Sequence, residues 1–193
     1  MLFRSVVADH GESFGEHPGV FRHGTSLYQT ELHVPLLIIP PAGARSPSGQ
    51  IVTEPVSLRD LAATIVGELG FQEGSPFRGE SLARFSHEPS ATAPADPAVR
   101  ERALSEVVPF DAQNPDPAQM LEPRWPLGAL AEGDWTYIRR EGNVREELFH
   151  ISDDAQELHN RALDPAVQGF LVRMRQALSR LTAGPLTPQR FPR

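Results

Sequence analysis

The chain of 193 residues contains no cysteine, no lysine and no long apolar run. Without cysteine it can form no disulfide, offer no thiolate to a metal and use no thiol nucleophile. The longest apolar stretch, residues 34–41, is far shorter than the roughly 20 residues of a membrane-spanning helix. The apolar N-terminal residues are too few for a secretory leader. We therefore expect no membrane span, with a cytoplasmic location by default and export if a longer form carries a leader.

The charge is one-sided and acidic. All 18 basic residues are arginine, and 25 acidic residues give a formal net charge of −7. The arginines form no cluster that could neutralise a phosphate backbone, so we expect no nucleic-acid partner. A content of 39% hydrophobic residues is enough for a buried core, and the 19 prolines predict long irregular connections.

Two short apolar runs, residues 2–9 and 33–39, predict neighbouring buried strands of an α/β sheet. The first run stops at Asp9-His10-Gly11, and the carboxyl ends of strands are where ligands bind in open α/β sheets. Residues 11–24 have neither helical nor strand periodicity and predict a loop. The capping-box pattern of Ser57 and Asp60, followed by helical spacing to residue 69, predicts a helix that covers the sheet.

The second half of the chain has a different composition. Residues 71–101 are rich in proline, serine, glycine and alanine and predict an irregular linker. Strand-like segments at 103–108, 135–139 and 147–151 predict a small antiparallel sheet. Asp164 and Pro165 begin a C-terminal helix with an apolar stripe. The predicted segments are therefore 1–70, 71–101 and 102–193.

The densest group of possible metal ligands and acid–base residues lies within fifteen positions of the first half: Asp9, His10, Glu12, Glu16, His17 and His23. Carboxylate and imidazole together can hold a divalent cation, and the share of carboxylates favours a hard ion such as calcium or magnesium. The alternative is a solvated loop whose charged side chains pair with one another.

Several separate motifs resemble the downstream active-site segment of the sulfatases, members of the alkaline-phosphatase-like superfamily. They are Ala8-Asp9-His10-Gly11-Glu12, Gly15-Glu16-His17, His23-Gly24, Leu27-Tyr28, Val34-Pro35-Leu36-Leu37-Ile38 and Val56-Ser57-Leu58-Arg59-Asp60-Leu61. Residues 135–138 and 147–151, with Asp154, Glu157 and Asn160, resemble the C-terminal signature of the family. The resemblance covers about 5–70 and 130–182. It implies a partial alkaline-phosphatase-like sheet with a covering helix, then a small antiparallel sheet and a C-terminal helix.

The resemblance also implies roles for three residues. Asp9 would be a carboxylate ligand of a divalent metal, calcium before magnesium, and His10 would be its neighbour in the same metal site. His23 would contact the sulfate group of the substrate and act catalytically by stabilising charge near the leaving oxygen. We expect these three side chains to converge. Glu12 and His17 either touch metal or substrate, or fix the loop.

The family pattern also includes an upstream part that this sequence lacks. That part supplies two further acidic metal ligands and a Cys or Ser, followed by Pro and Arg, that becomes the formylglycine nucleophile. The chain has no cysteine, and none of its serines stands in such a motif. We therefore expect a sulfuric ester hydrolase by family whose chain alone is inactive, from a truncated gene, a late start codon or a split gene.

Two alternatives to a sulfatase stay open. One is a phosphoryl-transfer or phosphonate hydrolase of the same superfamily, because a metal and an imidazole also suit phosphate. The other is a non-catalytic remnant that binds a partner or an anion. The strands at 2–9 and 33–39 read as apolar on both faces, and one helix cannot cover both. The expected partner is therefore the missing upstream half of the catalytic domain, or a second copy through self-association.

Overall fold

The computed structural model describes residues 4–39, 49–71, 76–77, 79–85, 102–107, 127–140 and 145–182. The chain divides into two compact units that alternate along the sequence, Met1–Ala8 with Pro35–Ala103, and Asp9–Val34 with Leu104–Arg193. Only residues 71, 76–77 and 79–85 of the expected linker are among the described ones. None of the helices in the described ranges has the length and apolar character needed to span a bilayer.

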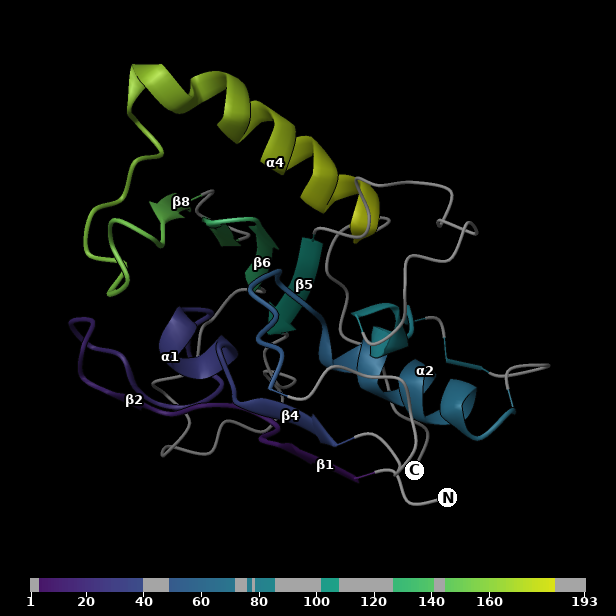
Figure 1. The fold of residues 1–193 in the computed structure, drawn as a ribbon. Coiled ribbons are helices and arrows are strands. Elements are labelled where there is room, and N and C mark those ends of the chain that lie inside the picture. The colour runs from purple at the N-terminus through teal and green to yellow at the C-terminus, as the bar shows by residue number, and fades with distance from the viewer. Residues whose placement is uncertain are drawn as a thin grey trace, which may run out of the picture. The chain divides into compact units, whose positions relative to one another are not determined.

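The first unit contains a two-stranded antiparallel ribbon. Strands β1 (Arg4–Val7) and β4 (Leu36–Ile39) lie side by side (Figure 1). In their antiparallel pairing, Val6 lies opposite Leu37. The prediction that these two runs are neighbouring strands is confirmed, but the prediction that they are buried is wrong for the described residues, none of which is buried. Both strands leave apolar side chains uncovered, since Val6 is 61% and Leu37 55% exposed.

Helix α2 (Leu58–Glu68) also belongs to the first unit. It begins at the predicted capping box, in which the Ser57 amide donates to Asp60 Oδ2 at 3.3 Å, and it ends before Gly70 at a φ of 76°. The face buried most deeply was not the one expected. Asp60 and Thr64 are buried because they accept hydrogen bonds from the segment that leads into the short helix η1 (Leu82–Phe85), whereas Leu58 is 40% exposed.

The second unit is built on a four-stranded sheet. The strands lie in the order β5 (Arg102–Val107), β6 (Leu127–Glu132), β7 (Trp135–Arg140) and β8 (Arg145–His150). β7 pairs antiparallel with both β6 and β8. The small antiparallel sheet is therefore confirmed, but β6 was not predicted from the sequence.

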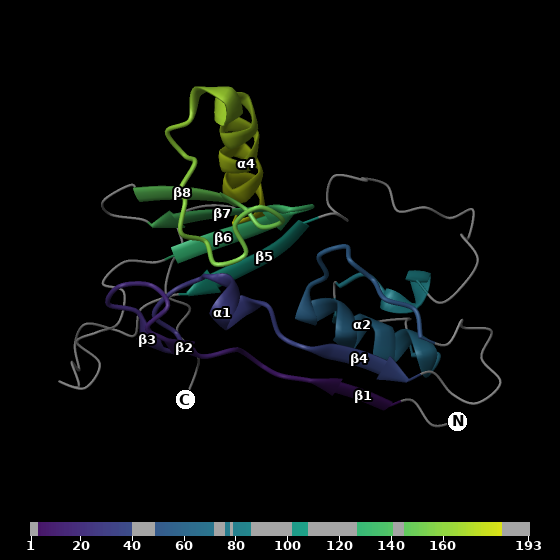
Figure 2. The ribbon, with the colours of Figure 1, turned by 60° about the vertical axis from the view of Figure 1, so that its left-hand side comes forward.

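The C-terminal helix covers one face of this sheet (Figure 2). Asp164 accepts a hydrogen bond from the Ala166 amide at 2.9 Å and so caps the short helix η3 (Pro165–Val167), which continues into α4 (Gln168–Leu181). The predicted helix start is confirmed. The apolar stripe of the helix packs on one face of the sheet. Residues of both, with Ala162 from the segment before the helix, form a core: Leu130, Tyr137, Leu148, Ala162, Leu171, Met174, Ala177 and Leu178.

The opposite face of the sheet is covered by the segment between residues 9 and 34. Its core consists of Leu27, Leu127, Ala129, Ile138 and Phe149, with Tyr28 and Leu32 packed against it. Tyr28 precedes the one-turn helix α1 (Gln29–Leu32), which lies across the sheet from α4 in Figure 2. The expected loop at 11–24 also contains a short hairpin, β2 (Ser13–Phe14) with β3 (Phe21–Arg22). This hairpin depends on side-chain bonds rather than on hydrophobic periodicity, so the sequence pattern missed it.

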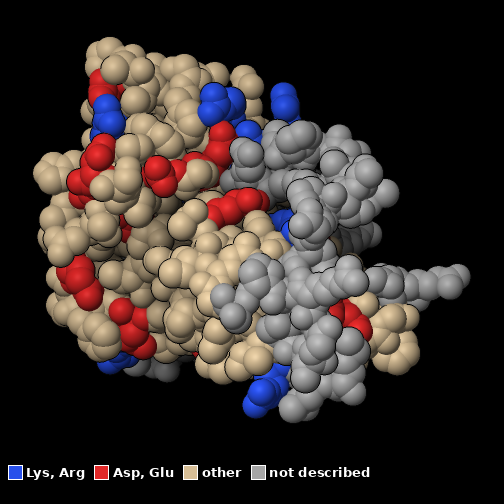
Figure 3. All heavy atoms as spheres, viewed as in Figure 1, with Lys and Arg blue, Asp and Glu red and all other residues tan. Residues whose placement is uncertain are grey.

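The surface carries charges of both signs. On the face drawn in Figure 3, the described acidic and basic side chains are interspersed, and the arginines form no broad field there.

Candidate functional site

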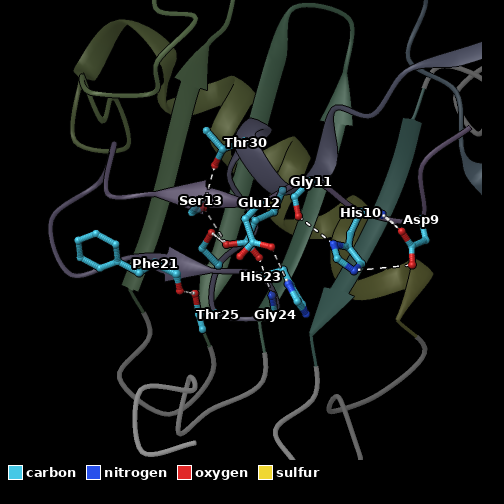
Figure 4. Close-up of polar contacts among 12 residues, drawn as sticks. Asp9, His10, Gly11, Glu12, Ser13, Phe21, His23, Gly24, Thr25 and Thr30 are labelled. Carbon is cyan, nitrogen blue, oxygen red and sulfur yellow. Dashed lines mark hydrogen bonds and ion pairs between the residues drawn. The ribbon is translucent and has the colours of Figure 1, made fainter. Parts of the chain in front are cut away.

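Four side chains of the segment 9–28 lie together in the second unit (Figure 4). The rings of His10 and His23 stack with their centroids 4.1 Å apart. Asp9 Oδ2 lies 3.7 Å from His10 Nε2, and Glu12 Oε2 lies 3.0 Å from His23 Nδ1. The structure thus brings Asp9, His10 and His23 together and adds Glu12 to them.

The hydrogen bond of His10 defines which ring nitrogen is free. His10 Nδ1 lies 2.8 Å from the Gly11 carbonyl oxygen, which can only accept, so the proton of the neutral ring is assigned to Nδ1. The Nε2 lone pair then faces the Asp9 carboxylate. Binding of one ring nitrogen to a backbone carbonyl is a usual way to orient a metal-ligating imidazole.

Glu12 orients the His23 ring and favours its protonated form. Its Nδ1 donates to the Glu12 carboxylate, and this hydrogen bond raises the pKa of the His23 imidazole, while the small loss of hydration opposes the rise. The side chain is half exposed, so the other ring nitrogen can meet a ligand from solvent. When it is protonated, the ring would offer an approaching anion a charge-assisted hydrogen bond.

The hairpin places the Glu12 and His23 pair. Ser13 pairs with Arg22 in the β2–β3 ladder, so Glu12 and His23 are the next residues on the two arms. Arg22 has a φ of 71° and Gly24 a φ of 74°, which turn the second arm back toward the first. The side-chain hydrogen bond between Glu12 and His23 closes the open end of the hairpin.

The sequence analysis missed Glu31, which is buried on α1. Its Oε1 accepts hydrogen bonds from the hydroxyls of Ser13 and Ser26, and its Oε2 accepts one from the Gly24 amide at 2.8 Å. The Gly11 amide donates to the Glu31 carbonyl at 2.8 Å. In the sequence, a glutamate in a short polar run looks like a surface residue. The only signal that it is buried was the set of small hydrogen-bond donors, Ser13, Gly24 and Ser26, in the preceding loop.

Glu16 and His17 do not join the cluster of Asp9, His10, Glu12 and His23. The Glu16 carboxylate accepts from the Phe14 amide at 2.7 Å within its own turn. His17 is buried, and its ring stacks on Tyr28 with centroids 3.6 Å apart. Burial lowers the pKa of the His17 imidazole, so the ring is neutral and packs as part of the loop.

Residues of the C-terminal sheet region anchor α1, and the sequence analysis did not identify them as parts of the site. Tyr28 Oη donates to the Glu147 carboxylate at 3.2 Å. The Gln29 amide donates to Glu157 Oε2 at 2.6 Å, and Gln29 Nε2 donates to Thr136 Oγ1 at 3.0 Å. The helix that holds the loop is thus fixed to β7, β8 and the turn after β8.

The donor set fits part of a metal shell. Asp9 offers an exposed carboxylate and His10 a free nitrogen 3.7 Å away, and an oxygen with a nitrogen at such a separation can be two ligands of one cation. In the described ranges, no set of three or more His, Asp or Glu side chains is arranged to hold a metal ion. The two residues therefore fit a divalent ion as a pair, and the other ligands would be water or groups outside the described ranges.

Comparisons with known proteins show what the chain is similar to. Residues 5–71 match the sulfatase family model. The fold resembles a phosphonate monoester hydrolase from Silicibacter pomeroyi (26% identity, TM-score 0.68, 93% of this chain and 34% of that chain). It also resembles the corresponding enzyme of Agrobacterium radiobacter (23%, 0.69, 92% and 34%) and a 2-O GAG sulfatase (21%, 0.71, 94% and 36%). No curated protein sequence matched the chain.

These matches confirm the predicted resemblance. They also show that the chain spans 34–36% of the length of those solved proteins. Mixed α/β architecture, with a four-stranded antiparallel sheet and a C-terminal helix, is shared with part of the sulfatase fold. Residues 5–71 of the chain therefore match the sulfatase family model, and the described fold resembles part of the fold of solved sulfatases and phosphonate monoester hydrolases.

Proposed function

We propose that this chain supplies part of the metal- and anion-binding site of a sulfuric ester hydrolase. Asp9 and His10 hold a divalent cation, with calcium favoured over magnesium, and His23 contacts the sulfate group. The observation that carries the proposal is the stacked His10–His23 pair. It joins the Asp9 carboxylate and a free His10 ring nitrogen on one side to the His23 imidazole, which is hydrogen-bonded to Glu12, on the other.

The chemistry of a sulfate ester suits this arrangement. When the ester bond breaks, negative charge moves onto the leaving oxygen, and a bound divalent ion supplies charge stabilisation to the sulfate oxygens. Protonated His23, oriented by Glu12, donates a hydrogen bond to the substrate and stabilises developing negative charge. Asp9 and His10 Nε2 would hold the divalent ion on the other side of the stacked rings.

The proposal assigns the sequence segments to parts of the family fold. Residues 1–70 are the C-terminal part of the catalytic α/β domain, with β1 and β4 in its sheet and α2 as a covering helix. Residues 71–101 are a linker, and residues 102–193 form a small α+β subdomain. The nucleophile and the remaining acidic ligands come from an upstream half, and that half, or a second copy, covers the exposed apolar side chains of β1 and β4.

Phosphonate or phosphate monoester hydrolysis is the second candidate. The match to the Silicibacter pomeroyi phosphonate monoester hydrolase, at 26% identity, favours it. Both ester classes present a tetrahedral anion. A divalent cation held by Asp9 and His10, together with the His23 imidazole, suits either one. Parallel titrations with inorganic sulfate and methylphosphonate would separate the two candidates by relative affinity.

We expect the isolated chain to bind calcium weakly and to show no turnover of an aryl sulfate. A hard cation takes six or more oxygen ligands, whereas Asp9 and His10 supply two ligands, so water must fill the remaining positions. Isothermal calorimetry with calcium should give a dissociation constant weaker than about 10⁻⁵ M, the weak limit of sensor sites. Asp9→Ala should abolish the heat.

Two results would contradict this expectation. A calcium affinity in the micromolar range or tighter would mean that the chain itself contains a complete shell. Hydrolysis of an aryl sulfate that disappears in Asp9→Ala would mean that the chain has its own nucleophile. Absence of any metal or sulfate binding by the folded chain would favour a non-catalytic remnant.

A further inference from the structure

We propose that Glu31 is a positioning residue that sets the distance between the two arms carrying the proposed site. The inference rests on the proposed function for what the site binds. The geometry that Glu31 fixes does not depend on any ligand. Glu31 touches none of the four site side chains through the hydrogen bonds found for it, and it acts through the backbone and side chains that flank them.

The Glu31 carboxylate is buried and surrounded by uncharged hydrogen-bond donors. The residue is 4% exposed, and its two oxygens accept from the Ser13 hydroxyl, the Ser26 hydroxyl and the Gly24 amide. Hydrogen bonds to an ionised carboxylate are stronger than those between neutral groups. Removal of the carboxylate would leave the buried donors without their acceptor, which costs free energy for each donor.

The donors come from both arms of the loop. Ser13 follows Glu12 directly on the first arm, and Gly24 follows His23 directly on the second (Figure 4). The Gly11 amide, which follows His10, donates to the Glu31 carbonyl. His10, Glu12 and His23 are therefore each followed directly by a residue that is hydrogen-bonded to Glu31.

This arrangement differs from that of an ordinary buried polar residue. Glu146 on β8 also has a largely buried carboxylate with three side-chain hydrogen bonds, from the Tyr137 hydroxyl and two nitrogens of Arg175. Those bonds join the sheet to α4 and involve no residue of the loop. Substitution of Glu146 is thus a matched control, because it removes a carboxylate without removing the hydrogen bonds between Glu31 and the loop.

The test is a nuclear magnetic resonance comparison of the full chain with Glu31→Ala, Glu146→Ala and the milder Ser26→Ala. The stacked rings of His10 and His23 should give a ring-to-ring Overhauser cross-peak and upfield-shifted ring protons. In Glu31→Ala we expect loss of the cross-peak and a downfield shift, while the Tyr137 ring signals stay in place. Glu146→Ala should move the Tyr137 signals and leave the histidine signals unchanged.

Ser26→Ala keeps the test decisive if Glu31→Ala does not fold. It removes one of three donors, so we expect a partial shift of the His23 ring protons and a weaker cross-peak in a folded protein. Unchanged histidine signals in folded Glu31→Ala or in Ser26→Ala would overturn the positioning role. A sulfate titration of the unsubstituted chain reports separately on the proposed function, because failure to bind sulfate leaves the ring geometry untouched.

Discussion

Gly11→Ala should unfold the segment that carries the candidate site and lower the stability of the chain by roughly 2–4 kcal/mol. A Cβ at residue 11 would lie 2.0 Å from the Thr30 carbonyl oxygen and 3.2 Å from Glu31 Cα. Both are backbone atoms, so the loop arm must move away from α1. The hydrogen bond from the Gly11 amide to the Glu31 carbonyl would then break. Urea denaturation followed by circular dichroism measures the loss.

Gly169→Ala is the matched control for this substitution. Residue 169 lies in α4, and a Cβ there would meet no atom within 4 Å. Alanine is a better helix former than glycine by about 1 kcal/mol, so this variant should be as stable as the original chain or slightly more stable. Equal stability of Gly11→Ala and the original chain would show that the loop arm does not approach α1 so closely.

Glu157→Gln should stabilise the chain at pH 8 by up to about 3 kcal/mol and have little effect at pH 4.5. Burial raises the pKa of the Glu157 carboxyl from 4.5 to about 7; the Gln29 amide opposes this, and the Asp154 and Glu147 carboxylates add to it. Glu157 Oε1 is buried and has no hydrogen-bond partner in the described part of the chain. Ionisation of this carboxyl therefore costs more in the folded state than in the unfolded state.

The sign follows from proton binding. Between pH 4.5 and 7 the folded chain holds the Glu157 proton and the unfolded chain has released it, so this group contributes less stability as the pH rises. Melting temperatures of both proteins from pH 4.5 to 8 measure the difference. Glu146→Gln is the opposite control, because Arg175 lowers the pKa of Glu146 and the substitution should destabilise the chain at neutral pH. A constant difference between Glu157→Gln and the original chain across this range would refute the raised pKa.

The elements predicted well from the sequence are those with local signals. α2 and η3 begin at capping residues whose chemistry is visible in the sequence, Ser57 with Asp60 and Asp164 with Pro165. β6 was missed because its residues, Leu127–Glu132, contain glycine and two alanines and become a strand through pairing with β7. Such pairing is a non-local property that a short window of residues does not contain.

The sequence predicted the motif residues of the candidate site, but it did not predict the buried glutamates that hold the loop and α1 in place. Asp9, His10 and His23 stand in recognisable motifs, and the structure brings them together. Glu31 stands in no quoted motif and Glu157 only in the C-terminal signature, and nothing in their spacing shows that both are at least 96% buried. Their burial depends on the packing of α1 against the sheet, which joins residues more than 100 positions apart in the chain.

The most direct test of the proposed site is where a hard cation binds. Manganese prefers the same oxygen-rich ligands as calcium and magnesium, and its unpaired electrons broaden nearby nuclear magnetic resonance signals. We expect the first signals to broaden to be those of Asp9, His10 and His23, with recovery when calcium is added and no broadening in Asp9→Ala. Broadening centred instead on the acidic turn at Asp153 and Asp154, or unchanged in Asp9→Ala, would contradict the assignment of the metal and sulfate site to these residues.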